Sequence, residues 1–331
     1  MRFHSLIRRE FLGVLGGAVA ALPLAARAQQ PGRIARIGYI SPGTGRYPAD
    51  DAFEESLQQY GWTKEQNIRI EYRYTGGRQD TVLPLVTEVV GLGVDVLVTW
   101  GPPLSLATKR ASTQTPLVFL VTFDPVDLGL VSNLARPGGN VTGVTSLASL
   151  EIFAKRLQLL RECLPSLTHV AVLASTEQTR SSRANDALTT AAKGLGIELH
   201  DLEIQAPAEL EGAIRKAKDQ GIQALYVWPS GFTLSFAKQI SDTANAHGLP
   251  SCHSFREGAS AGGLLSYAAD LKEEARRGAA YVDKILRGTP PGILPVEQLS
   301  KYELLVNLRT SRVLGLTLPP SLLATADEVI E

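Results

Sequence analysis

Aromatic and small polar side chains stand where predicted strands end, and their types suit recognition of a small solute. Two continuous apolar runs, 95–99 and 116–122, have the composition of strands covered on both faces of a parallel sheet. Each run leads into a loop with an aromatic ring, Trp100 or Phe123. Because ligands of open α/β sheets bind outside the carboxyl ends of the strands, these loops are predicted to form a binding rim.

The candidate ligand-binding residues all lie at the ends of predicted strands or in the loops that follow. An aromatic ring can cover an apolar or aromatic body. Asp124 could pair with an ammonium group, although an Asp before Pro125 can also simply cap a turn. Free N–H groups at the start of the helix after Pro102 and Pro103 would receive a carboxylate. For each ring, core packing is the alternative role. The candidates in the first half of the chain are Ser41, Pro42, Gly43, Trp100, Gly101, Ser105, Phe123 and Asp124, and those in the second half are Ser175, Thr176, Trp228, Ser230, Phe255 and Tyr267.

Three patterns that could indicate other chemistry are incomplete. The glycines of 43–45 begin like a dinucleotide-binding motif, but the third glycine position is occupied by Pro48. Residues 258–262 match the G-x-S-x-G string of hydrolases, yet all five histidines precede that serine, and a strand-like segment follows it. His247 and His253 have no Cys/His cluster beside them. We therefore predict no catalytic residue, no metal site and no cofactor, and expect that the protein is not an enzyme.

A repeated strand–helix–strand pattern predicts the elements that position these loops. Strands are predicted at 34–40, 68–74, 95–99, 116–122, 169–174, 198–204, 224–228 and 249–254, and helices at 50–60, 80–91, 150–163, 183–195, 208–220 and 236–247. Right-handed βαβ crossovers of this kind build doubly wound sheets. The fold class is therefore α/β, with two Rossmann-like lobes.

The last part of the chain is too small for a third lobe. It offers one strand at 263–267, one helix at 271–286, an extended stretch at 294–306, and short helices near Thr310 and Ser321. One strand and one helix cannot bury a core alone. This part is therefore expected to complete the two lobes already begun.

The first 28 residues have the features of an export signal. Arg8 and Arg9 precede an apolar run, 14–26, and an A-x-A site ends at Ala28. The run is about thirteen residues long and too short to span a bilayer. The paired arginines favour the twin-arginine route, whereas Ile7 in place of Ser or Thr leaves the Sec route as the alternative. No cysteine follows the cleavage site, so we expect a protein that is free in the periplasm.

The charge of the chain argues against a nucleic-acid-binding protein, and its two cysteines bear on whether it forms a disulfide. The chain has 33 basic and 33 acidic residues. The predicted signal holds four arginines and one glutamate, so the rest has a net charge near −3. No basic patch of the kind that nucleic acid requires is present in the sequence. Cys163 and Cys252 are predicted to be two separate buried thiols, although export would permit a disulfide.

Several segments resemble one protein family. Residues 123–131 (FDPVDLGLV), 136–145 (RPGGNVTGVT), 262–267 (GGLLSY) and the tail 316–331 are similar to those of ABC transporter substrate-binding proteins, in the family that includes tryptophan and tyrosine uptake components.

The resemblance implies a type I periplasmic-binding fold in which the chain crosses between lobes three times. It places 33–145 plus 257–288 in the first lobe and 146–256 plus 289–331 in the second. A monomer would close by a hinge over a small aromatic or carboxylate-bearing solute and deliver it to an ABC permease in the inner membrane. A ligand-sensing periplasmic receptor domain and an exported α/β enzyme are the alternatives.

Overall fold

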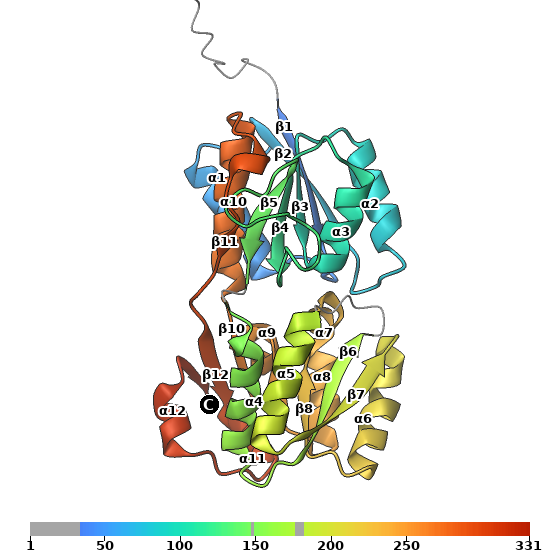
Figure 1. Ribbon diagram of the computed structural model, residues 1–331, viewed down its shortest axis with the longest axis vertical. Helices are drawn as coiled ribbons and strands as arrows, with labels where there is room; N and C mark the ends of the chain where they lie inside the picture. Colours follow the sequence, from blue (N-terminus) through green and yellow to red (C-terminus); the bar gives the residue numbers. More distant parts are fainter. Residues whose placement is uncertain (1–33, 147–148, 176–181) are drawn as a thin grey trace, which may run out of the picture. The chain divides into compact units, whose positions relative to one another are not determined.

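The computed structural model describes residues 34–146, 149–175 and 182–331 and contains two separate β-sheets (Figure 1). The predicted export signal, with its paired arginines, and the candidate Thr176 lie outside the described residues. Helices cover both sheets, which confirms the predicted α/β class with two doubly wound layers. We call the layers around the two sheets the first lobe and the second lobe.

The first lobe is built on a parallel sheet of six strands. The order across the sheet is β11 (Glu297–Gln298), β5 (Val141–Thr145), β4 (Leu117–Thr122), β3 (Val96–Trp100), β1 (Ala35–Ser41) and β2 (Ile68–Tyr74). Every residue of β3 and β4 is buried. These strands lack alternation because both faces of the sheet are covered.

Helices cover both faces of the first sheet. On one face α1 (Pro48–Gln59) packs along α10 (Leu271–Leu286), and the other face is covered by α2 (Val82–Gly91) and α3 (Pro102–Ala111) (Figure 1). Trp62 ties the two helices of the first pair, since its indole Nε1 donates to Asp283 on α10 at 2.8 Å.

The second lobe is built on seven strands. Their order is β13 (Glu328–Ile330), β12 (Glu303–Asn307), β10 (Leu265–Ala268), β9 (Ser251–His253), β8 (Ala224–Val227), β6 (His169–Ser175) and β7 (Glu198–Ile204). Only the β10–β12 pairing is antiparallel among the described ladders of this sheet.

The helices of the second lobe follow the same layered plan. One face carries α4 (Glu151–Cys163) and α5 (Ser182–Leu195), and the other carries α6 (Leu210–Asp219) and α8 (Ala237–Ala246). Helix α6 buries Leu210, Ile214 and Ala217, an apolar stripe at helical spacing. The short helices are α7 (Gly231–Ser235), α9 (Arg256–Ser260), α11 (Leu308–Val313) and α12 (Pro320–Thr325), and single 3₁₀ turns lie at 207–209 and 291–293. Of all these elements, β5, α7, α9, β13 and the 3₁₀ turn at 291–293 were not predicted from the sequence.

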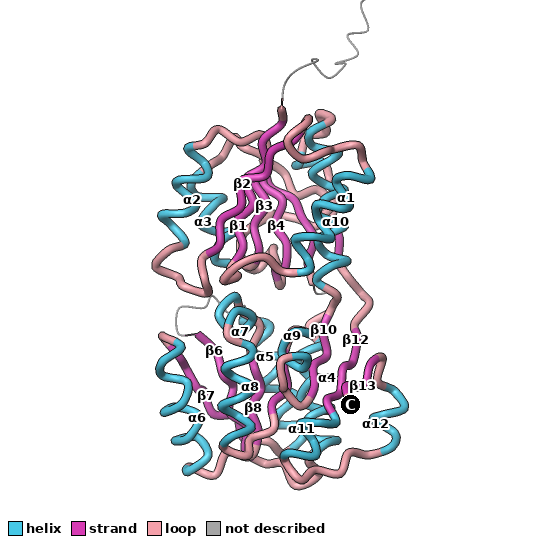
Figure 2. Tube along the Cα trace, turned by 180° about the vertical axis from the view of Figure 1, so that it is seen from behind, coloured by secondary structure: helices cyan, strands magenta, loops and turns pink. Residues whose placement is uncertain are grey.

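The structure changes the lobe boundaries expected for the last third of the chain. Strand β10 belongs to the second sheet, although 257–288 was assigned to the first lobe; α10, in the same range, does pack on the first sheet. Strand β11 pairs with β5 of the first sheet, although 289–331 was assigned to the second lobe. The chain therefore changes lobe after β5, after β10 and after β11 (Figure 1). The elements on either side of the second change, β10 and α10, are labelled in Figure 2. A strand and the helix after it can serve different lobes, which periodicity alone does not reveal.

The two cysteines are buried, free thiols. Burial raises the pKa of Cys163 to about 12 and that of Cys252 to about 12, so both thiols stay protonated at neutral pH. Within the described residues, no helix has the length and apolar character needed to cross a membrane.

Candidate functional site

The order of strands places a switch point in each sheet. In the first sheet it lies between β1 and β3, and in the second between β6 and β8. Ligands of open α/β sheets bind outside the strand ends at such points, because the loops there turn away in opposite directions and leave a crevice. The loops after β1, β3 and β8 are therefore the natural walls of a site.

A cavity lies between these loops and takes its walls from both lobes. Its lining is mostly apolar, with aromatic rings on each side. The first-lobe wall consists of Pro42, Thr75, Gly77, Arg78, Gln79, Val82, Trp100, Gly101, Pro102, Pro103, Leu104, Val121 and Phe123, and the second-lobe wall of Pro229, Ser230, Gly231, Phe232, Leu234 and Phe255. Among the described residues of this lining, Arg78 is the one with a charged side chain, and it pairs with Asp80 at 2.5 Å. An apolar or aromatic body suits such a lining.

The first-lobe wall has an unusual backbone at the end of β4. Val121 has φ +52° and Asp124 has φ +49°. The left-handed region is uncommon for any non-glycine residue and strained for a β-branched one such as Val121. Each such position costs on the order of 1–3 kcal/mol and persists only where the surroundings fix it. Strain of this kind gathers at binding sites, in agreement with the position of Val121 on the cavity wall.

A buried carboxyl group holds this strained segment. Glu274 of α10 accepts a hydrogen bond from the Val121 N–H at 2.5 Å and another from Ser146 Oγ at 2.6 Å. The side chain is fully buried, and burial raises the pKa of Glu274 to about 7. One side chain of α10 thus fixes the ends of both β4 and β5, next to a point where the chain changes lobe.

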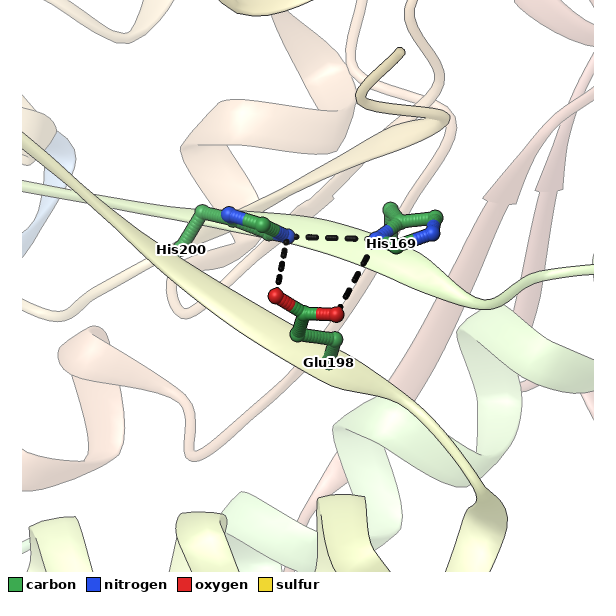
Figure 3. Close-up of side chains that lie close together, drawn as sticks. All are labelled: His169, Glu198 and His200. Carbon is green, nitrogen blue, oxygen red and sulfur yellow. Dashed lines mark hydrogen bonds and ion pairs between the residues drawn. The ribbon is translucent and has the colours of Figure 1, made fainter. Parts of the chain in front are cut away.

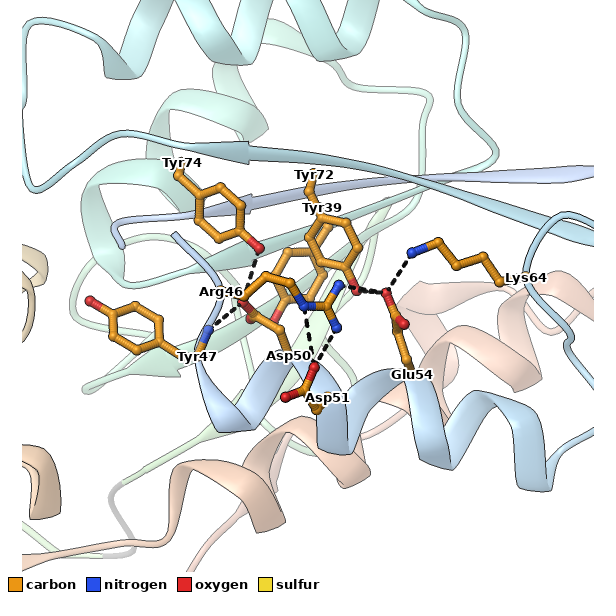
Figure 4. A network of polar contacts seen from close by, with 9 residues as sticks. All are labelled: Tyr39, Arg46, Tyr47, Asp50, Asp51, Glu54, Lys64, Tyr72 and Tyr74. Atoms are coloured by element: carbon orange, nitrogen blue, oxygen red, sulfur yellow. Dashed lines mark hydrogen bonds and ion pairs between the residues drawn. The ribbon is translucent and has the colours of Figure 1, made fainter. Parts of the chain in front are cut away.

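A second polar network holds the loop after β1 (Figure 4). Asp50, buried in the first turn of α1, accepts from the hydroxyls of Tyr39 at 2.7 Å and Tyr74 at 3.0 Å, and from the Tyr47 N–H at 3.0 Å. Burial, helped by Asp50, raises the pKa of Tyr39 well above its usual value, so the phenol stays a donor. The network thus fixes the segment that carries Pro42 to the sheet.

The second-lobe wall is built with regular caps. Ser230 precedes α7; its Oγ accepts from the Thr233 N–H at 3.0 Å, and its own N–H donates to Thr233 Oγ1 at 3.0 Å. The two walls touch at one edge of the cavity. Ser235 Oγ donates to the Pro42 carbonyl at 2.9 Å, and a Cβ placed on Gly231 would lie only 2.3 Å from Pro42 Cβ.

The structure brings together six of the residues predicted for a binding site. They line the cavity and come from both lobes: Pro42, Trp100, Gly101, Phe123, Ser230 and Phe255. The structure holds no solute, so their contact with one stays a prediction.

The other described candidates do not line this cavity. Ser41 and Ser175 are buried at the ends of β1 and β6. Ser105 is buried in the first turns of α3, where its Oγ bonds to Thr99 Oγ1 at 2.9 Å. Gly43 lies against the ring of Tyr47 in its own loop. Tyr267 packs on Tyr302 with ring centroids 5.6 Å apart.

Asp124 and Trp228 have other partners in the structure. Asp124 pairs with Arg183 of α5 at 2.7 Å, and its Oδ1 accepts a long turn bond from the Asp127 N–H. Trp228 is 2% exposed and stacks on Phe153, with ring centroids 4.9 Å apart. The alternatives given from sequence, turn capping for Asp124 and core packing for Trp228, describe these two residues better.

The sequence did not indicate two parts of the cavity wall. One part is the turn from Thr75 to Gln79, which follows β2. The sequence indicates that β2 is an outer strand, yet β2 ends at the same edge of the sheet as β1 and β3, so its turn reaches the cavity. Phe232 and Leu234 lie on α7, which is five residues long and too short to show helical periodicity. The glycine pair 76–77 was the one feature of the sequence that could have indicated the turn after β2.

The start of α3 is a weaker carboxylate site than expected. Gly101 is the N-cap, and Pro102 and Pro103 fill the first two helical positions. Proline has no N–H, so these residues remove two of the donors that a helix N-terminus normally offers. The Ser105 N–H bonds to the Gly101 carbonyl at 3.1 Å, so the N–H of Leu104, a residue of the cavity lining, is the donor that remains in this turn.

Ser260 has no nucleophile geometry. It is the last residue of α9, whereas a nucleophile elbow stands between a strand and a helix. His253 is buried, and burial lowers its pKa to about 4. Its ring lies against the backbone of Gly258 and Gly263, which is a packing role.

Comparison with known proteins gives a family match over most of the chain. The family model described as ABC transporter substrate binding protein matches residues 35–330. A protein named tyrosine-binding protein, from Clostridioides difficile (strain R20291), is 25% identical over 268 residues, covering 81% of this chain and 76% of that protein.

Two solved structures share the fold. A domain from Streptococcus pneumonia in complex with L-Trp superposes with a TM-score of 0.80 at 22% identity, over 90% of this chain and all of that one. The ligand-free, open structure of a substrate-binding protein with adhesive properties, from Clostridium difficile, gives 0.60 at 23% identity, over 90% of this chain and 99% of that one. At these identities the similarity establishes the fold, which is the expected type I periplasmic-binding fold.

Proposed function

The chain belongs to the family of ABC transporter substrate-binding proteins, and on that premise we propose that it captures a small solute with an aromatic body between its two lobes and delivers it to an ABC permease. Its relatives are solute-binding proteins rather than enzymes, in agreement with the absence of catalysis expected from the sequence. The solute is therefore released unchanged.

One observation carries this proposal: a cavity with aromatic rings from both lobes lies at the switch points of both sheets. Trp100 and Phe123 supply rings from the first lobe, and Phe232 and Phe255 from the second. Stacked or edge-on aromatic pairs contribute about 0.5–1.5 kcal/mol beyond the area they bury. One relative is named for tyrosine and another was solved with L-Trp, which supports an aromatic amino acid as the solute.

Hinge closure is the proposed capture step. The chain links the lobes at three places, and the walls meet at contacts such as Ser235 with Pro42, which separate if the lobes move apart. The superposition is better with the L-Trp complex than with the open, ligand-free relative, although the identities are almost equal. Such a difference in TM-score would arise if the same fold had its two lobes closed in one structure and open in the other.

The proposed location is the periplasm. Proteins of this family typically act outside the cytoplasm, and the A-x-A site before Gln29 predicts removal of the first 28 residues. Export by the twin-arginine route stays a prediction from Arg8 and Arg9.

The test is isothermal titration calorimetry of the mature protein, unfolded and refolded first to remove any solute carried from the cell. We expect saturable one-to-one binding of L-tryptophan, L-tyrosine or L-phenylalanine and at least about tenfold weaker binding of L-leucine. Tryptamine lacks the carboxylate and indole-3-propionate lacks the ammonium group, so the pair separates the contributions of the two charges. Binding of L-leucine as tight as that of every aromatic amino acid would overturn the aromatic assignment.

A further inference from the structure

A cluster of two histidines and one glutamate lies in the second lobe, away from the cavity (Figure 3). His169 is the first residue of β6, and Glu198 and His200 lie at the start of β7. The cavity loop after β8 leaves the opposite end of this parallel sheet, since β8 runs parallel to β6. Since β6 has seven residues, the two ends are about 20 Å apart. The cluster is therefore outside the proposed solute site.

The sheet itself brings the three side chains together. In the register of β6 and β7, His169 is opposite Glu198 and Ala171 is opposite His200. Residues two apart on a strand point to the same face, so Glu198 and His200 share a face beside His169. The backbone at this point is fixed, because the Glu198 N–H donates to the Thr168 carbonyl at 2.7 Å and the His169 N–H donates to Gln223 Oε1 at 3.0 Å.

The separations of the donor atoms are close to those of one face of a metal coordination tetrahedron, and one ligand atom from each residue lies within 4.8 Å of the other two. His169 Nδ1 lies 3.2 Å from His200 Nε2 and 3.7 Å from a Glu198 oxygen, and His200 Nε2 lies 3.5 Å from the other oxygen of that carboxylate. Tetrahedral zinc with bonds of about 2.0–2.1 Å places its ligand atoms about 3.3 Å from one another. Small rotations of the side chains would therefore let three donors reach one ion.

We propose that His169, Glu198 and His200 form a binding site for a transition-metal ion, with Zn²⁺ the ion that the geometry and donor set suit best. Two imidazoles and a carboxylate select Zn²⁺ and its first-row neighbours over Mg²⁺ and Ca²⁺, which prefer all-oxygen sites. The side chains are 45%, 66% and 39% exposed, so the ion has access and water can supply the fourth ligand. Bound metal would tie β7, the edge strand of this sheet, to β6.

The chain offers a matched control for the metal site. His247 Nε2 lies 2.8 Å from Glu211 on the same lobe, which gives a partly exposed histidine–carboxylate pair with two ligands instead of three. Within the described part of the chain, the cluster at His169 is the one group of three or more such ligands that lie within reach of a single ion. A variant at His247 therefore removes a histidine but no three-ligand site.

The experiment uses the mature protein without an affinity tag, freed of metal with a chelator, and titrates Zn²⁺ by calorimetry in a non-chelating buffer. We expect one tight equivalent of Zn²⁺, weakening by at least about tenfold in His200→Ala and in Glu198→Gln and unchanged in His247→Ala. Mg²⁺ at the same concentration should give no heat of binding. Circular dichroism checks that each variant keeps its fold.

A second readout identifies the ligands directly. Co²⁺ in place of Zn²⁺ should give visible absorption of the intensity typical of tetrahedral sites in the parent protein, and that band should be lost in His169→Ala. Equal Zn²⁺ affinity in the parent and in His200→Ala, or loss of binding in His247→Ala alone, would overturn the proposal. Solute binding is expected to be the same with and without Zn²⁺, so failure of this site leaves the proposed transport function untouched.

Discussion

The two walls of the cavity are built by different means. On the first-lobe wall the backbone is strained at Val121, and buried acidic groups, Glu274 and Asp50, hold the loops in place. On the second-lobe wall Ser230 and Thr233 form a regular helix cap, and the tryptophan at the end of β8 is ordinary core.

This difference shows where each wall is vulnerable. A loop held by buried hydrogen bonds fails when a partner is removed, because the remaining donors are left without an acceptor. A wall held by packing fails when volume is removed and a space is left behind. The first-lobe loops should therefore respond to loss of the Glu274 or Asp50 carboxylate, and the core behind the second-lobe wall to loss of the volume of Trp228.

The largest effect is expected for Trp228→Ala. The ring is buried and stacked on Phe153, so its removal should lower the free energy of unfolding by about 3–5 kcal/mol. Trp100→Phe is the partner experiment, because it keeps a ring on the cavity wall. It should cost less stability and mainly weaken solute binding. Urea unfolding and calorimetry measure the two quantities, and a stable Trp228→Ala protein with lost affinity would place that ring at the solute instead.

The next effect is expected for Asp50→Ala. It leaves the hydroxyls of Tyr39 and Tyr74 and the Tyr47 N–H without their acceptor, at a cost of about 2–4 kcal/mol. Its neighbour Asp51 is exposed and pairs with Arg46, so Asp51→Ala should change stability by less than about 1 kcal/mol. Similar unfolding midpoints for the two variants would refute the polar anchor of this wall.

The buried Glu274 carboxyl should make the stability of the protein depend on pH, by an amount comparable to the effect expected for Asp50→Ala. Burial raises its pKa from 4.5 to about 7 in the folded protein. Below pH 4.5 the carboxyl is protonated in both the folded and the unfolded state and contributes nothing to the pH dependence. Between pH 4.5 and 7 the unfolded chain releases the proton and the folded protein retains it, so stability falls as pH rises. Above pH 7 the accumulated cost is about 3 kcal/mol.

Glu274→Gln removes this titration and keeps the shape of the side chain. The free energy of unfolding of the variant, relative to the parent protein, should therefore rise by about 3 kcal/mol from pH 4.5 to pH 7. Glu273→Gln is the control; the pKa of Glu273 is lowered, chiefly by its hydrogen bond to Arg277, so no such rise is expected. Parallel pH profiles of the parent and Glu274→Gln would contradict the buried anchor.

The smallest effect on stability, and a specific one on binding, is expected for Gly231→Ala. The added Cβ meets Pro42 of the other wall, so it should hinder closure and weaken solute binding by about tenfold without unfolding either lobe. A Cβ at Gly212 of α6 meets nothing within 4 Å, which makes Gly212→Ala the matched control. Unchanged affinity in both variants would show that this contact plays no part in capture.

Much of the fold could be predicted from sequence because apolar runs and helix ends follow local rules. Helix α5 ends before Gly196 and α8 before Gly248, two glycines with positive φ, close to the residues expected. Trp100 and Phe123, which the pattern placed where two strands end, both line the cavity; Trp100 is the last residue of β3 rather than part of the loop after it. Local patterns failed where one segment serves two lobes, as at β10 and α10.

Three of the candidates that do not line the cavity, Asp124, Trp228 and Tyr267, contact side chains that are distant in sequence. Nothing in the sequence around Asp124 indicates that it pairs with Arg183, 59 residues away. Trp228, in contrast, could have been placed. Tyr226 and Trp228 face the same core, while Leu225 and Val227 face the other, so the alternation of β8 continues through the tryptophan. The predicted strand, 224–228, already included Trp228, so its alternation alone would have placed the ring in the core.

The measurement that tests the central claim most directly is small-angle X-ray scattering of the mature protein with and without a saturating solute found by calorimetry. If two lobes close over the solute, the radius of gyration should fall on binding, and Gly231→Ala should show a smaller fall than Gly212→Ala. A solute that binds one-to-one and leaves the scattering curve unchanged would contradict capture by closure of the lobes.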